Sequence, residues 1–195
     1  MTVRVVIAED EAIIRLDLKE TLEEEGYEVV GETGLGDEAV RLVRELRPDV
    51  AILDIKMPGM DGLTAAREIT SERLSAVLIL TAFSQRDLIE QARDAGALAY
   101  LVKPFQRSEL IPAVEVALGR HKEIQALHAE VKGLEDQLDT RRVVDRAKGI
   151  LMDTHKLSER DAFDRIQKTA MRERLTMKVV GQRIIDGELG PDKQA

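Results

Sequence analysis

The amino-acid sequence predicts an α/β protein, in which a five-stranded parallel sheet covered by helices on both faces is followed by a coiled-coil helix and a small three-helix bundle. Two observations carry this prediction. Short runs rich in Val and Ile alternate with amphipathic helical patterns over about the first 120 residues, as is typical of parallel strands joined by helices. Beyond them only helical patterns occur, and a length of 195 residues allows one to two domains.

Each element of the first part follows from a local pattern. The apolar runs predict strands over residues 3–8, 27–30, 50–53, 77–80 and 99–102. The amphipathic patterns predict helices over residues 12–25, 37–47, 63–70 and 86–95, and from residue 108 onward. Glycine and proline residues lie at the joins, where the chain must turn.

The last of these helices has no obvious stop. Apolar residues recur along it at alternating spacings of three and four, namely Ile124, Leu127, Val131, Leu134 and Leu138. This spacing makes an apolar seam of two heptads. The seam either pairs with another helix in a coiled coil or packs against its own domain, as an ordinary surface helix does.

A different helical pattern begins after Thr140. It predicts helices near residues 141–154, 158–171 and 177–186, which are too short to be stable alone and should pack as a bundle. The expected domains are a first domain over residues 1–120, a helical coiled-coil linker over 121–140, a three-helix domain over 141–187 and a disordered tail over 188–195.

Composition excludes several classes of protein. The chain has no cysteine, hence no disulfide framework and no thiolate metal site. It has no apolar stretch long enough to cross a bilayer and no signal-peptide pattern, so we expect a cytoplasmic protein without a membrane partner. Aromatic residues make up 3% of the chain and Trp is absent, which argues against a platform of stacked aromatics for single strands.

Charge is distributed unevenly along the chain. The net charge is −8, yet residues 141–183 contain twelve Lys and Arg against six Asp and Glu, a balance of +6 that leaves −14 for the remainder. A basic segment beside an acidic body predicts that the two parts have different partners. A polyanion is the candidate partner of the basic segment.

Chemically reactive side chains follow the predicted strands. Glu9 and Asp10 follow the first strand, while Asp54, Thr81 and Lys103 follow the third, fourth and fifth. Ligands of parallel sheets bind beyond the carboxyl ends of the strands, so these residues should converge in one crevice. Clustered carboxylates favour a hard cation such as Mg²⁺. Lys103 and Thr81 would offer a positive charge and a hydroxyl to a phosphoryl group, with Asp54 as the candidate nucleophile.

Three other kinds of enzyme fit these residues less well. Residues 34–39 (GLGDEA) match a dinucleotide-binding fingerprint, but they follow the second strand and lie near the acids, and the plain alternative is a turn that opens the second helix. An aspartate-nucleophile phosphatase of another fold would usually carry a second Asp where this chain has Lys56. Because the first histidine is His121, no histidine-based hydrolase can form within the first domain.

At these positions the chain resembles the receiver domain of two-component response regulators. The resemblance covers roughly residues 3–120. Its motifs are Glu9-Asp10, Asp54 with residues 56–62 (KMPGMDG), Thr81-Ala82, and Tyr100 three residues before Lys103-Pro104-Phe105. The resemblance implies a flavodoxin-like (βα)5 fold.

The resemblance also implies a role for each matched residue. Asp54 would accept a phosphoryl group from the phosphohistidine of a sensor histidine kinase. The implied ligands of Mg²⁺ are Glu9, Asp10, Asp54 and the backbone carbonyl of Lys56. Lys103 would pair with the phosphate, while Thr81 and Tyr100 would form a conformational switch pair. A receiver assists only its own Mg²⁺-dependent phosphorylation and dephosphorylation, so no other enzymatic activity is expected.

The basic segment contains the candidate contacts to nucleic acid. Gly149 lies inside a predicted helix, where glycine costs up to about 1 kcal/mol relative to alanine, so we expect another helix or a phosphate to approach its backbone closely. The candidate residues for binding nucleic acid are Arg142, Arg146, Lys148, Gly149, Lys168, Arg172, Arg174 and Lys178.

Over about residues 130–187 the chain resembles the ANTAR domain, a three-helix RNA-binding module of transcription antiterminators. Its motifs are residues 147–152 (AKGILM), Leu157-Ser158, Ala162-Phe163, Ala170-Met171 and Ile184-Ile185, with departures at Ala170, Arg174 and Gly181. The resemblance implies that two ANTAR units bind paired RNA hairpin loops. We therefore expect an antiterminator that forms a homodimer when phosphorylated. The alternatives are a DNA-binding transcription factor that uses the same helices and a protein-interaction adaptor.

Overall fold

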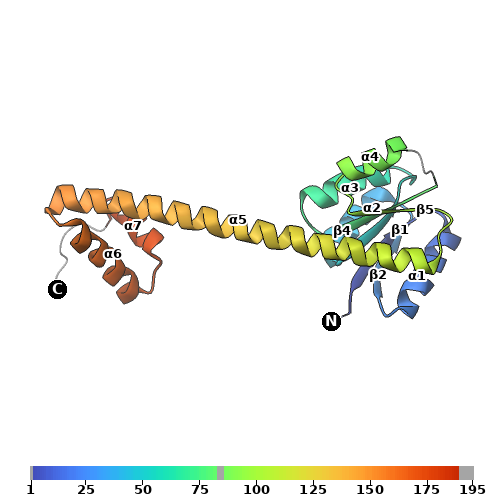
Figure 1. The fold of residues 1–195 in the computed structure, drawn as a ribbon, viewed down its shortest axis with the longest axis horizontal. Coiled ribbons are helices and arrows are strands. Elements are labelled where there is room, and N and C mark those ends of the chain that lie inside the picture. The colour runs from blue at the N-terminus through green and yellow to red at the C-terminus, as the bar shows by residue number, and fades with distance from the viewer. Residues whose placement is uncertain (1, 83–85, 189–195) are drawn as a thin grey trace. The chain divides into compact units, whose positions relative to one another are not determined.

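The computed structural model describes residues 2–82 and 86–188, and it divides the chain into two compact units, Met1–Gln125 and Ala126–Ala195 (Figure 1). The disordered tail expected over residues 188–195 lies, except for Glu188, outside the described residues. Among the helices that the structure describes, none is both long enough and apolar enough to span a membrane.

The first unit is built on one parallel sheet with the strand order β2-β1-β3-β4-β5. Its strands are β1 (Arg4–Ala8), β2 (Glu28–Thr33), β3 (Val50–Asp54), β4 (Ala76–Thr81) and β5 (Ala99–Val102). Its helices are α1 (Ala12–Glu24), α2 (Gly36–Leu46), α3 (Gly62–Ser71), α4 (Arg86–Asp94) and the first part of α5 (Arg107–His155). The predicted flavodoxin-like arrangement is confirmed.

Successive strand residues point to two separate cores, one on each face of the sheet, because side chains alternate along a strand. Val6 and Ala8 of β1 pack with residues of α2, α3 and α4. Val5 and Ile7 pack with residues of α1 and α5. Every residue of the central strand β3 is buried. The carboxyl ends of β1 and β3 are therefore held between two layers of helices (Figure 1).

Strand β2 extends to Thr33, three residues beyond the predicted end at residue 30. Its added residues, Gly31, Glu32 and Thr33, are not an apolar run, yet they pair with Val6, Ile7 and Ala8 of β1. An edge strand needs only backbone hydrogen bonds on one side and can carry polar side chains, so its end was not visible as a change in hydrophobicity.

Helix α5 runs without interruption from Arg107 to His155, so the helix expected to begin near residue 141 does not begin there. Residues 138–142 (LDTRR) contain neither proline nor glycine, and nothing in them ends a helix. The pattern changes after Thr140 because the helix is exposed just before this residue, whereas after it Val144, Ala147 and Leu151 are buried in a core. The predicted bundle helix is the C-terminal part of α5.

The second unit packs this part of α5 against α6 (Glu159–Glu173) and α7 (Met177–Ile185). Its core consists of Val144, Ala147, Leu151, Ala162, Ile166, Ala170, Val180 and Ile184. Ser158 caps α6 by accepting a hydrogen bond from the Asp161 backbone N–H, and Thr176 caps α7 by accepting one from Val179. These caps satisfy backbone donors that a helix leaves free at its start.

The apolar seam is exposed to solvent. Leu127, Leu134 and Leu138 are each more than half exposed, at 61%, 54% and 57%, and Val131 is 49% and Ile124 39% exposed. These exposures favour the coiled-coil alternative over the one in which the seam packs against its own domain. A seam of this kind gains hydrophobic stabilisation when a second apolar surface covers it.

Candidate functional site

The carboxyl edge of the sheet brings together the residues that the sequence placed at strand ends. Glu9 follows β1 and Asp54 ends β3, and these two strands are neighbours at the point where the strand order reverses. Thr81 ends β4, and its carbonyl accepts a hydrogen bond from the Lys103 backbone N–H at 2.8 Å. A cavity of about 400 Å³ at this edge is lined by Asp10, Glu11, Asp54, Ile55, Lys56, Thr81, Ala82, Leu88 and Lys103.

Lys103 ties two of the carboxylates together. Its Nζ lies 2.5 Å from Glu9 Oε2 and 2.8 Å from Asp54 Oδ1. The other Asp54 oxygen, Oδ2, accepts a hydrogen bond from the Lys56 backbone N–H at 2.8 Å. Glu9 is fully buried and Asp54 is 5% exposed. Both oxygens of Asp54 are thus oriented by the loops that follow β3 and β5.

The electrostatics of this group follow from burial and charge. Burial raises the pKa of Glu9, the charge of Asp54 raises it further, and the hydrogen bond from Lys103 only partly offsets this rise. For Lys103, burial alone would lower the pKa, but its hydrogen bonds to Asp54 and Glu9 outweigh burial and leave the pKa raised. Lys103 therefore stays charged, and the carboxylates carry more negative charge than one ammonium neutralises.

The residues fit a small divalent cation. Glu9, Asp10 and Asp54 offer carboxylate oxygens that lie within 4.8 Å of one another. Three ionised carboxylates and one ammonium carry a net charge of −2, which one Mg²⁺ would balance. The buried Glu9 Oε2 has the Lys103 ammonium as its partner, at 2.5 Å. Asp10 is exposed, so the group is open to solvent.

The sequence did not identify Arg15 as part of this site. Arg15 lies on α1, and its Nη1 donates a hydrogen bond to the Glu9 carbonyl at 2.5 Å. On the other side, the Glu9 backbone N–H donates to the Thr33 carbonyl at 3.0 Å. Arg15 also faces Glu32 of β2, at 3.9 Å. Arg15 is one of two cations in the helix that follows an acidic loop, and this pattern does not reveal that its side chain turns back toward the loop.

Two glycines allow the loops of the site to pack closely. Helix α2 begins at Gly36, in the turn that opens it, and a Cβ there would lie 2.1 Å from the Met60 carbonyl oxygen. A Cβ at Gly62 would lie 1.9 Å from the Asp54 carbonyl oxygen. Gly36 therefore has a packing role against the loop after β3, while Gly34 lies beside the backbone of Asp10 in the loop after β1, and packing explains the fingerprint-like pattern without a dinucleotide.

Thr81 and Tyr100 lie on the neighbouring strands β4 and β5. Thr81 is 3% exposed, whereas Tyr100 is 46% exposed. In the register of the two strands, Tyr100 is paired with Ile79, two residues before Thr81. Thr81 therefore lines the cavity, while Tyr100 is nearly half exposed to solvent.

The seven cations among the candidate RNA-binding residues fall into two groups, those with an ion pair and those without. Lys148 Nζ lies 2.8 Å from both Asp145 and Glu159, and Lys178 Nζ lies 2.5 Å from Asp139. Arg172 pairs with its neighbour Glu173 at 3.3 Å. Among the described residues, four other candidates have no ion pair, namely Arg142, Arg146, Lys168 and Arg174. The second group is the one whose charge is available to an anion.

The helical glycines of this unit differ in their surroundings. A Cβ at Gly149 would meet no atom within 4 Å, so no other helix of the described chain approaches it. The expected approach of another helix is therefore not found within the described chain. A Cβ at Gly181 would lie 2.9 Å from Val143 Cγ1, which explains why this chain has glycine where ANTAR domains commonly have alanine.

The fold and the acidic site define a response regulator, and the chain belongs to this family. Residues 5–115 match the response regulator receiver domain, and residues 132–185 match the ANTAR domain. The chain is 57% identical to the transcriptional regulatory protein PdtaR of Mycobacterium tuberculosis over 183 residues, which are 94% of this chain and 89% of PdtaR. The resemblances seen in the sequence are confirmed by these matches.

The first unit alone is similar to many receivers. It is 40% identical to the chemotaxis protein CheY of Thermotoga maritima over 112 residues, which are 57% of this chain and 93% of CheY. Among solved structures, the receiver domain of the response regulator NarL from Mycobacterium tuberculosis matches with a TM-score of 0.58 and 35% identity. That match covers 60% of this chain and 97% of the NarL domain.

Proposed function

We propose that the protein is a transcription antiterminator controlled by phosphorylation. A sensor histidine kinase transfers a phosphoryl group to Asp54, and the ANTAR domain then binds hairpin loops of nascent RNA. The observation that carries the proposal is the bridge from Lys103 to Glu9 and Asp54 at the edge of the sheet, in a chain that also matches the ANTAR domain. The proposed location is the cytoplasm, where sensor kinase domains and nascent RNA occur together.

The proposed transfer uses groups that the fold already orients. An Asp54 oxygen forms a P–O bond as the P–N bond of the phosphohistidine breaks. Lys103 then pairs with a phosphoryl oxygen in place of a carboxylate, and the Thr81 hydroxyl and the Tyr100 ring follow as the switch pair. Glu9, Asp10, Asp54 and the Lys56 carbonyl would hold Mg²⁺, which would supply the charge neutralisation that phosphoryl transfer needs. The receiver is proposed to assist only its own phosphorylation and dephosphorylation.

The proposed output depends on the exposed seam and the basic surface. Phosphorylation favours a homodimer that pairs the seams of two chains, and the dimer presents two ANTAR domains to two loops. Arg142, Arg146, Lys168 and Arg174 are the cations that support this proposal best, since acids do not neutralise them within the described chain. Lys148, Lys178 and Arg172 could reach RNA only by giving up an ion pair.

One titration separates RNA binding from the alternatives. The phosphorylated protein is titrated with a two-hairpin RNA and with duplex DNA of equal length at several stated salt concentrations. A preference for the RNA that persists as salt rises supports the proposal, because purely electrostatic binding would fall for both nucleic acids. Equal affinity for DNA favours the DNA-binding alternative, and binding to neither favours a protein-interaction adaptor.

Replacing Lys103 by alanine should separate phosphorylation from output. The bond between Lys103 and the phosphoryl group exists only in the phosphorylated state, so losing it removes the free energy that shifts the conformational equilibrium. We expect phosphorylated Lys103→Ala to bind RNA no more tightly than the unphosphorylated protein does. Lys122→Ala, an exposed cation of α5, is the control. Full activation of Lys103→Ala would assign Lys103 a structural role only.

Replacing Gly149 by alanine should raise stability and lower RNA affinity together. The added Cβ has open space, and alanine in a helix interior is favoured over glycine by about 0.5–1 kcal/mol. If a phosphate approaches the backbone at Gly149, the Cβ displaces it and RNA binding weakens severalfold. Gly119→Ala, another glycine of α5 with open space, should be stabilising without this loss. Thermal unfolding and RNA titration of both variants provide the measurement, and unchanged affinity in Gly149→Ala would remove Gly149 from the RNA surface.

A further inference from the structure

The second unit contains a cavity of about 560 Å³ between the C-terminal part of α5 and helices α6 and α7. Its apolar wall consists of Val144, Phe163 and Met177, and its polar wall includes Arg141, Asp145 and Lys148. The volume lies within the range of about 300–1,000 Å³ that is usual for small-molecule sites. An apolar wall with a few fixed polar groups is the general form of such a site.

Phe163 is the unusual member of this wall. Its neighbour Ala162 and the residue one turn later, Ile166, are fully buried in the core of the unit, whereas Phe163 is 40% exposed and is not part of that core. The whole chain has only three Phe and two Tyr. An aromatic ring that the core does not need, placed in a cavity wall, is available to stack on a ligand.

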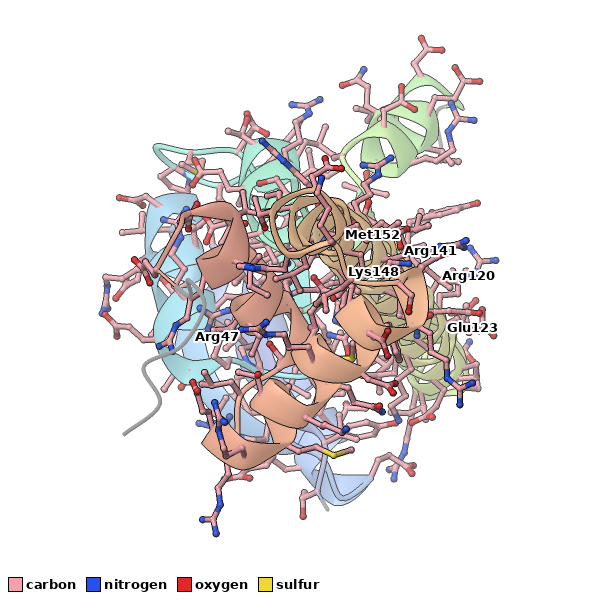
Figure 2. All side chains as sticks on the ribbon, turned by 90° about the vertical axis from the view of Figure 1, so that its left-hand side faces the viewer. Arg47, Arg120, Glu123, Arg141, Lys148 and Met152 are labelled. Carbon is pink, nitrogen blue, oxygen red and sulfur yellow. The ribbon has the colours of Figure 1, made fainter. Side chains whose placement is uncertain are left out.

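Lys148, one member of the polar wall, is held in place before any ligand arrives. Lys148 bridges Asp145 of its own helix and Glu159 at the start of α6, and its side chain is only 16% exposed. Arg141, Lys148 and Met152 lie on one side of α5, as their spacing of seven and four residues requires (Figure 2). Donors and acceptors are thus presented along one helix face beside the Phe163 ring.

The charges of the wall select the kind of ligand. Asp136 and Asp145 balance Arg141 and Lys148, so the cavity is not an anion site. A neutral group with a flat apolar face and both donors and acceptors on its edge satisfies these walls, and a nucleobase is such a group. Carboxylates accept hydrogen bonds from base amino groups, and Arg donates to base carbonyl and ring nitrogen atoms.

We propose that this cavity binds one unstacked base of the RNA loop, with the base stacked on Phe163. The proposal rests on the proposed RNA-binding function and specifies its sequence-reading site. Proteins read RNA sequence mostly at loops whose bases are splayed out and stacked on aromatic or Arg side chains. The phosphates on either side of the base would lie near the free cations Arg142 and Arg146 of the same helix. The scarcity of aromatics excludes a platform for successive bases, but one pocket needs only one ring.

A fluorescent base tests this pocket in the full-length protein. Hairpin RNAs carry 2-aminopurine at each loop position in turn, and the absence of Trp leaves the signal free of protein emission. We expect the emission to change on binding at one loop position. Removing the base there, as an abasic nucleotide, should weaken binding about tenfold, which is within the range for one stacked base. Phe163→Leu should lose the emission change and weaken binding of the intact RNA by about the same factor.

Three matched variants make the result specific. Phe163→Tyr keeps the ring and should retain the emission change. Met171→Leu, at a 71% exposed position of the same helix, should bind as the parent does. Phe163→Leu should show no further loss with the abasic RNA, because the two changes remove the same contact. Circular dichroism checks that Phe163→Leu remains folded, as its position outside the core leads us to expect.

The outcomes separate this proposal from the function on which it rests. If the hairpin is preferred over duplex DNA but the losses from Phe163→Leu and the abasic base add, the pocket is overturned and RNA binding stands. If Phe163→Leu changes the sedimentation of the protein without RNA, the cavity holds a second copy of the chain and the base pocket is overturned. If neither the parent protein nor any variant prefers the hairpin RNA over duplex DNA, the proposed RNA-binding function itself is overturned.

Discussion

Asp54→Asn should reduce phosphorylation below detection. Asn has the size of Asp and can still accept the Lys56 N–H and face Lys103, so the fold should be retained, but its amide lacks a nucleophilic oxygen. Incubation with a small phosphodonor and Mg²⁺, followed by mapping of the adduct by mass spectrometry, gives the measurement. Removal of Mg²⁺ by a chelator should also abolish transfer, because the clustered carboxylates would then repel the incoming phosphoryl dianion.

Asp61→Asn is the matched control for this result. Asp61 caps α3 by accepting hydrogen bonds from the Thr64 backbone N–H and hydroxyl, and it lies seven residues after Asp54. Its replacement changes an acid of the same loop without touching the carboxylate cluster, and Asn also caps helices well. The control should keep the label at Asp54. Label retained elsewhere in Asp54→Asn would mean that another residue is the acceptor.

Glutamates at Leu127 and Leu134 should prevent the phosphorylated protein from binding RNA tightly. Both side chains are more than half exposed in the single chain, so charging them should cost the isolated molecule little. In a paired seam the same charges would be buried next to their copies. Two linked RNA contacts gain affinity by factors of about 10²–10⁴, so we expect a loss of about a hundredfold with phosphorylation of Asp54 unchanged.

Sedimentation and RNA titration of this double variant provide the measurement. The control carries glutamates at Ala126 and Ala129, which lie on the outer face of the same two heptads, and it should dimerise and bind RNA normally. A coiled coil of two heptads is marginal alone, and phosphorylation can therefore control its pairing. Undiminished RNA affinity from a strictly monomeric double variant would show that the seam has no role in pairing.

The sequence predicted the sheet and its acidic edge because both depend on local patterns. Apolar runs identify the strands, and parallel connections place the carboxyl ends of these strands on one edge of the sheet. The sequence alone therefore predicts that Glu9, Asp54 and Lys103 lie together. The role of Arg15 could not be predicted in this way. It depends on the rotamer of one side chain on α1 and on where the carbonyl of Glu9 points.

The basic surface was less predictable for a similar reason. All eight candidate residues have the same sequence signature, a positive charge or a glycine in a basic segment. Whether a cation is free depends on the helices that pack beside it: α6 brings Glu159 to Lys148, while Lys178 of α7 meets Asp139 of α5. From composition alone these cations look available to a ligand, whereas in the folded chain they already form ion pairs. Helix α5 gave the opposite kind of error, since the sequence predicted a break near residue 141 where the helix continues. The apolar pattern changes there because the C-terminal part of α5 packs against α6 and α7.

The full burial of β3 has a consequence for amide hydrogen exchange. Asp54 ends a strand that has no exposed residue and is paired with β1 as far as Leu53 and with β4 as far as Asp54, so the backbone of this strand should be among the slowest of the domain to exchange. Asp10 lies in an exposed loop, where exchange needs only local opening. The carboxylate cluster thus joins the least mobile part of the domain to one of its more mobile parts. Assembling the cluster around a cation costs conformational entropy almost entirely in the loop after β1, while the acceptor itself is held by the fold.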